Sequence, residues 1–339
     1  MGISNFEDKL IQKMTQKILE SIYEPLFLDC SYGFRTGRGC HDAIQELGRH
    51  LVSNEVQTVI DMDLSNFFGS VDHKLLQEML SEKIKDRRLI RFIIRMFKAS
   101  VLEEEGDLSV SDEGVPQGSV CSPILANIYA HFVIDVWVKE VVKLHCRGRV
   151  ELFRYADDAV ICCRHQRDAE RIKAALEKRL AKNNLKLNED KTKLVAFSKD
   201  KRSRGTKQGV FDFLGFTFYL GRSRKGSVIP KVKTSGKRLR SKLKSVNQWA
   251  RQVRNRYRLP VIWKTFCQKL VGHIRYFGVS FNAKQMDKFL YQATRLLFKW
   301  LNRRSQRRSF NWDQFGCFMQ QFPLPRVRIY HPLYGPVAR

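Results

Sequence analysis

Most hydrophobic positions of this 339-residue chain recur every three or four residues, which is the spacing of amphipathic helices. Pro25 is expected to end the first of these helices, and Ser122 with Pro123 is typical of a helix start. In the first 200 residues the pattern predicts helices at 5–28, 40–52, 72–82, 86–99, 123–145 and 168–184, the last of them capped by Asp168.

A second pattern, short apolar runs rich in β-branched and aromatic residues, predicts strands. One run begins at Thr58 and ends in acids. Another, 153–163, is interrupted at its centre by two acids and predicts a β-hairpin with these acids at its turn. A shorter strand is expected at 194–197, and residues 211–220 resemble a hairpin with Leu214 and Gly215 at its turn. The sequence therefore predicts an α+β domain in which helices 123–145 and 168–184 back the sheet that contains both acid strands.

From residue 235 onward the helical period dominates. Three helices are expected: one from Ser235 or Ser241 to Arg258, one from Pro260 to Tyr276, and one from Asn282 to Arg303. The aromatic residues of this region have core spacing, and we expect most of their side chains to be buried; they are Trp249, Trp263, Tyr276 and Phe277.

The net charge of +28 lies entirely at this end of the chain. Residues 201–339 hold 32 Lys and Arg against three acids, whereas 1–200 is close to neutral. Such a segment neutralises phosphates, so we expect strong, salt-sensitive and largely sequence-independent binding to nucleic acid. A disordered basic tail is the alternative, but hydrophobic residues at helical spacing through 243–301 favour folded helices with basic faces.

Two classes of protein are disfavoured by the composition. No apolar stretch reaches the length of a membrane span, and the amino terminus carries acids where a signal peptide would carry bases, so we expect a soluble cytoplasmic protein without a membrane partner. The eight cysteines have no repeated Cys-x-x-Cys spacing, which gives neither a zinc signature nor a disulfide framework.

Acids at the ends of two strands are the first sign of chemistry. Asp61 and Asp63 share one face of their strand because side chains alternate, and either could approach Asp157 in the hairpin. Carboxylates set in apolar strands need a compensating charge, and Mg²⁺ is typically held by one or two carboxylates plus substrate phosphates. A solvated turn is the simpler alternative for an isolated acid pair.

A loop rich in glycine and proline, from Gly114 to Gly118, lies between the two acid strands and leads into a helix. Backbone N–H groups of such a loop can approach a phosphate or a base without obstruction by side chains. An acid-ended strand, this loop and an acid hairpin, in that order, are typical of the palm of a nucleic-acid polymerase.

Six short motifs resemble those of reverse transcriptases encoded by group II introns and occur in the order of that family. They are Ser31-Tyr32-Gly33-Phe34-Arg35, Pro116-Gln117-Gly118, Ser122-Pro123-Ile124-Leu125-Ala126-Asn127-Ile128-Tyr129, Tyr155-Ala156-Asp157-Asp158, Asn188-Glu189-Asp190-Lys191-Thr192 and Phe213-Leu214-Gly215-Phe216. The resemblance implies a right-hand polymerase with fingers and palm over 1–230, an antiparallel catalytic sheet, an all-α thumb and maturase domain over 231–305, and a basic tail over 306–339.

The resemblance also implies a role for individual residues. Two Mg²⁺ ions would be held by the catalytic acids Asp63, Asp157 and Asp158. The nucleotide would be contacted by Leu64, Phe68, Gln117, Gly118 and Lys191, with Phe68 beneath its sugar and Lys191 near the leaving pyrophosphate. Leu214 and Gly215 would grip the primer end, and Arg35 and Arg38 would lie along the template.

The function implied is RNA-directed DNA synthesis together with assistance to splicing and mobility of intron RNA. The partners would be an RNA template, structured intron RNA, a DNA primer or target and deoxynucleoside triphosphates, with a homodimer as a further option. The matching pattern begins inside the first fingers block, so the segment before it is expected to be missing, and no zinc-nuclease spacing follows. Intact acids favour an active polymerase; the missing segment favours a non-polymerising splicing cofactor or a domesticated reverse transcriptase.

Overall fold

The computed structural model describes residues 5–98, 101–102, 108–109, 114–115, 118–199, 209–304 and 310–334. The chain divides into two compact units between Leu214 and Gly215. The functional boundaries expected at 230/231 and 305/306 remain predictions. In the fold, residues 216–230 group with the helices that follow them rather than with the palm.

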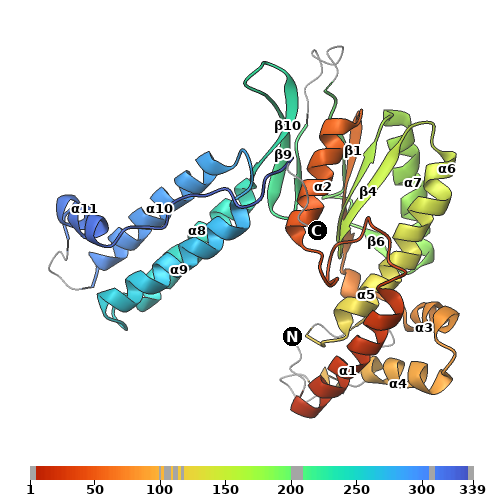
Figure 1. Ribbon diagram of the computed structural model, residues 1–339. Helices are drawn as coiled ribbons and strands as arrows, with labels where there is room; N and C mark the ends of the chain where they lie inside the picture. The colour runs from red at the N-terminus through yellow and green to blue at the C-terminus, as the bar shows by residue number, and fades with distance from the viewer. Residues whose placement is uncertain are drawn as a thin grey trace. The chain divides into compact units, whose positions relative to one another are not determined.

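The first unit is built on an antiparallel sheet in the order β4-β5-β1-β6 (Figure 1). Strands β6 and β7 pair with successive parts of the edge of β1 that β5 leaves open. The strands are β1 (Thr58–Ser65), β4 (Val150–Tyr155), β5 (Asp158–Cys163), β6 (Lys186–Leu187) and β7 (Lys193–Ala196). Three further strands of this unit are β2 (Val101–Leu102), β3 (Leu108–Ser109) and β8 (Phe211–Phe213).

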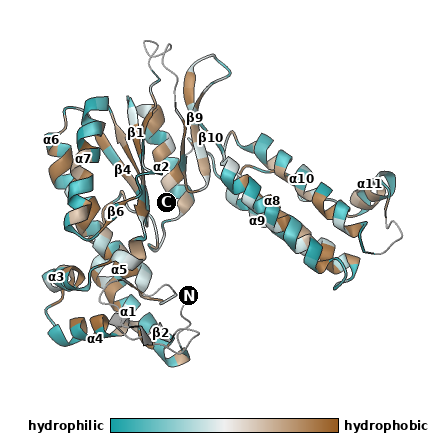
Figure 2. Ribbon diagram, turned by 180° about the vertical axis from the view of Figure 1, so that it is seen from behind, coloured by the Kyte–Doolittle hydropathy of each residue, from teal (hydrophilic) through white to brown (hydrophobic). Residues whose placement is uncertain are grey.

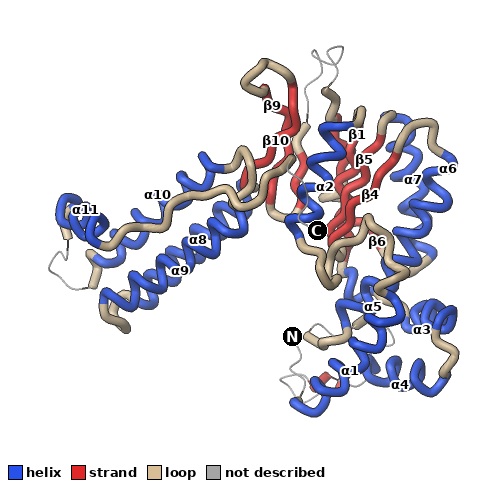
Figure 3. The backbone as a smooth tube through the Cα atoms, viewed as in Figure 1, coloured by secondary structure: helices blue, strands red, loops and turns tan. Residues whose placement is uncertain are grey.

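Helices cover both faces of the sheet, with α2 on one side and α6 and α7 on the other (Figure 3). The α7 side holds the main core, in which Met62 and Ile161 of the strands pack with Leu125 and Leu176 of the helices. The helices of the first unit are α1 (Phe6–Tyr23), α2 (Cys40–Ser53), α3 (His73–Lys83), α4 (Arg87–Lys98), α5 (Ser122–Ala130), α6 (Lys143–His145) and α7 (Gln166–Lys182). This arrangement confirms the predicted α+β class with an antiparallel sheet backed by helices.

The helix expected at 123–145 is one continuous helical run over 122–145, but it is not regular. Two stretches, His131–Asp135 and Val138–Val142, are π-helical, and the N–H of Val136 bonds to the carbonyl of His131 five residues earlier. Such insertions turn the side chains that follow to a new direction. One π stretch ends at Asp135, a fully buried acid.

The second unit contains a two-stranded antiparallel ribbon and four helices. The elements are β9 (Phe216–Arg222), β10 (Val228–Thr234), α8 (Gly236–Val253), α9 (Leu259–Phe277), α10 (Ala283–Leu301) and α11 (Trp312–Gln321). The side chain of Ser235 accepts a hydrogen bond from the N–H of Arg238, which confirms Ser235 as the start of α8. Hydrophilic and hydrophobic residues alternate along these helices (Figure 2). Their hydrophobic side chains form a shared core that includes Phe266, Leu297 and Phe315.

Three features of the structure differ from the sequence-based expectations. Asp168 does not cap α7, which begins two residues earlier; its carboxylate accepts a hydrogen bond from the N–H of Gly148 instead. Strands β2, β3, β6 and β10 were not predicted. Part of the expected basic tail is helix α11, because its aromatic residues fill the core of the second unit. Within the described residues, no helix is long and apolar enough to cross a membrane.

Candidate active site

The register of the sheet brings the predicted acids together. Asp63 of β1 lies directly opposite Asp158 of β5, and Asp61 lies on the same face two residues earlier. Asp157 is exposed in the turn that joins β4 and β5, next to Asp158. The sheet face that carries Asp61, Asp63 and Asp158 is opposite the face that packs against α7. Helix α7 therefore does not cover these acids.

The carboxylates lie close enough together to disturb one another's ionisation. Burial raises the pKa of Asp158 to about 7, and the charges of Asp61, Asp157 and Asp63 add to the shift. The N–H of Leu214, 3.1 Å from Oδ2 of Asp158, partly offsets it. Burial likewise raises the pKa of Asp61 to about 6. A cluster of this kind has a deficit of positive charge, as a cation site has before its ion binds.

One cation of the protein already faces the cluster. The ammonium of Lys191 lies 2.9 Å from Oδ2 of Asp63, and this hydrogen bond raises the pKa of Lys191. The segment that carries Lys191 is fixed to β1, since the N–H of Asn188 donates to the carbonyl of Asp63 over 2.9 Å. The structure thus places Lys191 at the acids, and its role beside the pyrophosphate remains a prediction.

The acids fit Mg²⁺ through the chemistry of their donors. Mg²⁺ is a hard cation that takes carboxylate oxygens and usually keeps several waters and substrate phosphates. In the part of the chain that the structure describes, no three His, Cys, Asp or Glu side chains form a ready-made metal cage. Asp63, Asp157 and Asp158 are therefore suited to a site that a nucleotide's phosphates complete.

Phe68 and Gly118, both predicted to contact the nucleotide, lie among the described residues. Half-buried Phe68 sits in a 3₁₀ turn, Phe67–Ser70, and its carbonyl accepts a hydrogen bond of 2.8 Å from the N–H of Val115. The start of the glycine-rich loop is therefore held against Phe68. Gly118 is exposed, whereas Gln117 lies outside the described residues.

Two other predicted contacts involve the backbone. Leu64 is 5% exposed in the core, so only its main chain is available to a nucleotide. Leu214 and Gly215 both have positive φ, 51° and 82°, as in a tight two-residue turn. The turn sets the N–H of Leu214 on Asp158, which ties the predicted primer-grip segment to the acids.

The two arginines predicted to lie along the template have different surroundings in the structure. Arg35 is 8% exposed, and it donates to Glu24 and to the carbonyls of Leu28 and Ser31. This placement argues against a phosphate contact by Arg35, whose guanidinium serves the fold. Arg38 is half-buried and pairs with the exposed Asp29, so its side chain stays partly open to solvent and its template contact remains a prediction.

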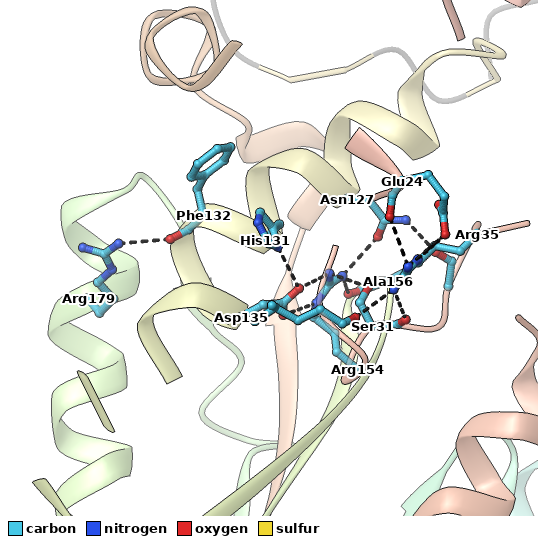
Figure 4. Close-up of polar contacts among 12 residues, drawn as sticks. Glu24, Ser31, Arg35, Asn127, His131, Phe132, Asp135, Arg154, Ala156 and Arg179 are labelled. Atoms are coloured by element: carbon cyan, nitrogen blue, oxygen red, sulfur yellow. Dashed lines mark hydrogen bonds and ion pairs between the residues drawn. The ribbon is translucent and has the colours of Figure 1, made fainter. Parts of the chain in front are cut away.

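The acid hairpin is held by a buried arginine that the sequence analysis gave no role. Arg154 is fully buried, and its guanidinium makes two hydrogen bonds of 2.7 and 2.6 Å to the carboxylate of Asp135 (Figure 4). Further bonds reach Asn127, the hydroxyl of Ser31 and the carbonyl of Ala156. Since Ala156 directly precedes Asp157, this network fixes the turn that carries Asp157.

Comparison with known proteins agrees with this geometry. The family model described as reverse transcriptase (RNA-dependent DNA polymerase) matches residues 1–218, more than half of the chain. The chain belongs to the reverse transcriptase family. Among solved structures, this reverse transcriptase resembles apo telomerase from Candida tropicalis, with a TM-score of 0.51, 13% identity, and coverage of 91% of this chain and 53% of the other. At that identity, the likeness concerns the fold alone.

Several of its curated relatives are named as intron proteins. The group II intron-encoded protein LtrA of Lactococcus lactis subsp. cremoris is 39% identical over 143 residues, 41% of this chain and 23% of LtrA. An uncharacterized 91 kDa protein in the cob intron of Schizosaccharomyces pombe is 42% identical over 131 residues, 39% of this chain and 16% of that protein. Nuclear intron maturase 3, mitochondrial, of Arabidopsis thaliana is 29% identical over 149 residues, which cover 44% of this chain and 20% of the maturase. The matched region spans less than a quarter of each relative, and the resemblance to group II intron reverse transcriptases and maturases is confirmed.

A glycine in this reverse transcriptase packs directly against the acid hairpin. A Cβ atom on Gly33 would lie 2.5 Å from the N of Ala156, a backbone atom that cannot move aside cheaply. Ala156 itself has a positive φ of 57°, so its conformation is already unusual for a residue with a side chain. We expect Gly33→Ala to shift the turn and to lower the free energy of unfolding by roughly 1–3 kcal/mol, as overpacking typically does.

Urea unfolding of the parent and of Gly33→Ala measures this effect. Gly316→Ala is a suitable comparison, because a Cβ on Gly316 would meet no atom within 4 Å. Equal stability of Gly33→Ala and the parent would show that the turn and the segment around Gly33 are not packed as described.

Proposed function

We propose that this chain is an RNA-directed DNA polymerase of the group II intron type, which copies RNA into DNA by phosphoryl transfer at Asp63, Asp157 and Asp158. The observation that carries the proposal is the register of β1 and β5, which sets Asp63 opposite Asp158 beside the exposed Asp157. A protein that only bound RNA would gain nothing from carboxylates gathered where phosphates must lie, because they repel each other and the ligand.

Two Mg²⁺ ions bound to these acids would activate the primer 3′-hydroxyl and neutralise the charge that develops on the triphosphate. The chain's own residues would orient the reactants. Asp63 and Asp157 would be the direct ligands, and Asp158, held by the N–H of Leu214, would support them. Lys191 would exchange Asp63 for the phosphates of the nucleotide, since an exposed ammonium on a flexible stem is free to turn.

Selection of the sugar would fall to Phe68. Its ring packs edge-to-face on Phe67 with centroids 5.6 Å apart, which limits its movement. A rigid ring beneath the sugar would exclude a 2′-hydroxyl by steric contact, and the loop around Gln117 and Gly118 would position the base against the template. The primer end would lie on the turn at Leu214 and Gly215, with Arg38 beside the template strand.

The helices of the second unit supply the charge for RNA binding. They belong to the segment 201–339, which contains 32 basic residues and only three acidic ones. We propose that the basic side chains of these helices hold the template-primer duplex and structured intron RNA, and that the protein thereby assists splicing and mobility of its intron. The same charge supports a second candidate function, a splicing cofactor that binds intron RNA without polymerising.

Two measurements on one preparation separate the candidates. Salt-dependent binding to structured RNA is expected for both. Extension of a DNA primer on an RNA template, with Mg²⁺ and deoxynucleotides, is expected only for the polymerase. Binding without extension would contradict the polymerase and leave the splicing cofactor, while extension with deoxynucleotides but not with ribonucleotides would support the role of Phe68.

A further inference from the structure

Helices α8 and α9 of the second unit border a cavity of about 520 Å³. This volume is within the range of small-molecule sites, roughly 300–1,000 Å³. Aromatic side chains form much of its wall, among them Trp249, Tyr276 and Phe289. Trp249 and Tyr276, which the sequence suggested as core residues, are only half-buried here.

A buried histidine in this cavity lacks polar partners. His273 lines the cavity, is 7% exposed, and stacks on Phe289 with ring centroids 3.6 Å apart. Neither of its ring nitrogens has a hydrogen-bond partner among the described residues. Burial, with a further contribution from Lys242, lowers the pKa of His273 to about 4, so at neutral pH the ring presents one donor and one acceptor. Unpaired buried polar atoms cost stability, and a ligand with both donors and acceptors would recover that loss.

The mouth of the cavity is strongly basic. Three exposed cations line it, Arg238, Lys242 and Lys269, and none of the described residues that line it is acidic. The ammonium of Lys269 lies 5.3 Å from the centre of the Trp249 ring. A flat ligand with hydrogen-bonding edges and a negative charge would therefore be complementary to this site on three counts.

A nucleotide combines these properties. Its base has a π face and polar edges, and its phosphate carries the charge. Proteins recognise RNA mainly where bases are unstacked, by stacking them on aromatic side chains and bonding to their edges. We propose that the cavity between α8 and α9 binds one unstacked nucleotide of a single-stranded RNA, with its base beside Trp249 and His273 and its phosphate on Arg238, Lys242 and Lys269. The proposal rests on the proposed function in so far as the chain binds RNA.

One residue of the wall allows the cavity to be filled without disturbing the core. A Cβ on Gly272 of α9 would meet no atom within 4 Å, and Gly272 lines the cavity. Gly272→Leu therefore places a side chain in the space proposed for the base. Gly316 of α11 also has open space around it and does not line the cavity, so Gly316→Leu is the matched control.

The test is fluorescence anisotropy of a labelled 12-nucleotide single-stranded RNA, and of a duplex of the same length, with the full chain. We expect Gly272→Leu and Trp249→Ala to weaken binding of the single strand roughly tenfold and to leave duplex binding unchanged. The dependence of the single-strand affinity on salt should keep its slope, because no phosphate contact is removed. Gly316→Leu should bind both RNAs as the parent does.

An oligonucleotide without bases provides the second arm. The parent and Trp249→Ala should bind it equally, since only the base contact distinguishes them. Equal binding of the single-stranded RNA by the parent and Gly272→Leu, or equal losses for single strand and duplex, would overturn the proposal. The assay needs neither Mg²⁺ nor deoxynucleotides, so a chain that fails to extend a primer still reports on the cavity. Melting curves of each variant identify a loss that comes from unfolding.

Discussion

Replacing Arg154 by methionine is expected to lower the free energy of unfolding by about 3–5 kcal/mol, the usual cost of breaking a buried ion pair. The change leaves the carboxylate of Asp135 fully buried without its partner. It also removes the donor that the carbonyl of Ala156 accepts from. The loss therefore falls on the turn that holds Asp157.

Urea unfolding measures the effect, and a second variant tests its cause. Arg154→Met combined with Asp135→Leu removes both charges, so most of the lost stability should return. Arg149→Met is the control, because that arginine is exposed at the start of the same hairpin. A cost below about 1 kcal/mol for Arg154→Met, the range of a surface ion pair, would contradict the buried network.

Asp63→Asn is expected to reduce primer extension more than a hundredfold, whereas Asp61→Asn should retain most of the parent rate. Loss of a group that only hydrogen-bonds to a metal ligand typically lowers activity 10–100-fold, and Asp63 is proposed as a direct ligand. Asp61 accepts a hydrogen bond from the backbone of Asp212 and lies deeper, and an asparagine oxygen can accept the same bond.

The pair of variants decides a question that the sequence left open, since both acids share one face of β1. Extension rates under saturating RNA and primer, with filter binding of the template-primer measured in parallel, separate catalysis from binding. If Asp61→Asn lost activity as severely as Asp63→Asn, the assignment of Asp63, rather than Asp61, as the metal ligand on β1 would be wrong.

Much of the fold follows from local patterns in the sequence. Periodicity placed most helices to within a few residues, and the apolar arms around Asp157 and Asp158 predicted the β4–β5 hairpin because turn and strand signals agreed there. The pairing of Asp63 with Asp158 depends on the relative position of strands almost 100 residues apart, which no local pattern specifies. The resemblance to group II intron reverse transcriptases predicted that Asp63, Asp157 and Asp158 share one site, and the structure supplied the register that sets Asp63 opposite Asp158.

Other features depend on contacts that a sequence pattern does not reveal. Arg35 looked like a phosphate ligand, but Glu24 and two carbonyls surround its guanidinium. Arg154 owes its role to Asp135, which lies 19 residues earlier in a different element. Helix α11 did have a local signal, since Asn311 and Gln314 form a capping box. The charge of the surrounding residues obscured it.

Primer extension on an RNA template, compared between the parent chain and Asp157→Asn, tests the proposed polymerase most directly. Asp157 is exposed at the turn, so its replacement should leave folding and RNA affinity unchanged. We expect the parent to extend the primer in the presence of Mg²⁺ and deoxynucleotides, and Asp157→Asn to fail while binding the same template-primer. Extension by both proteins at similar rates, or by neither, would contradict catalysis at these acids.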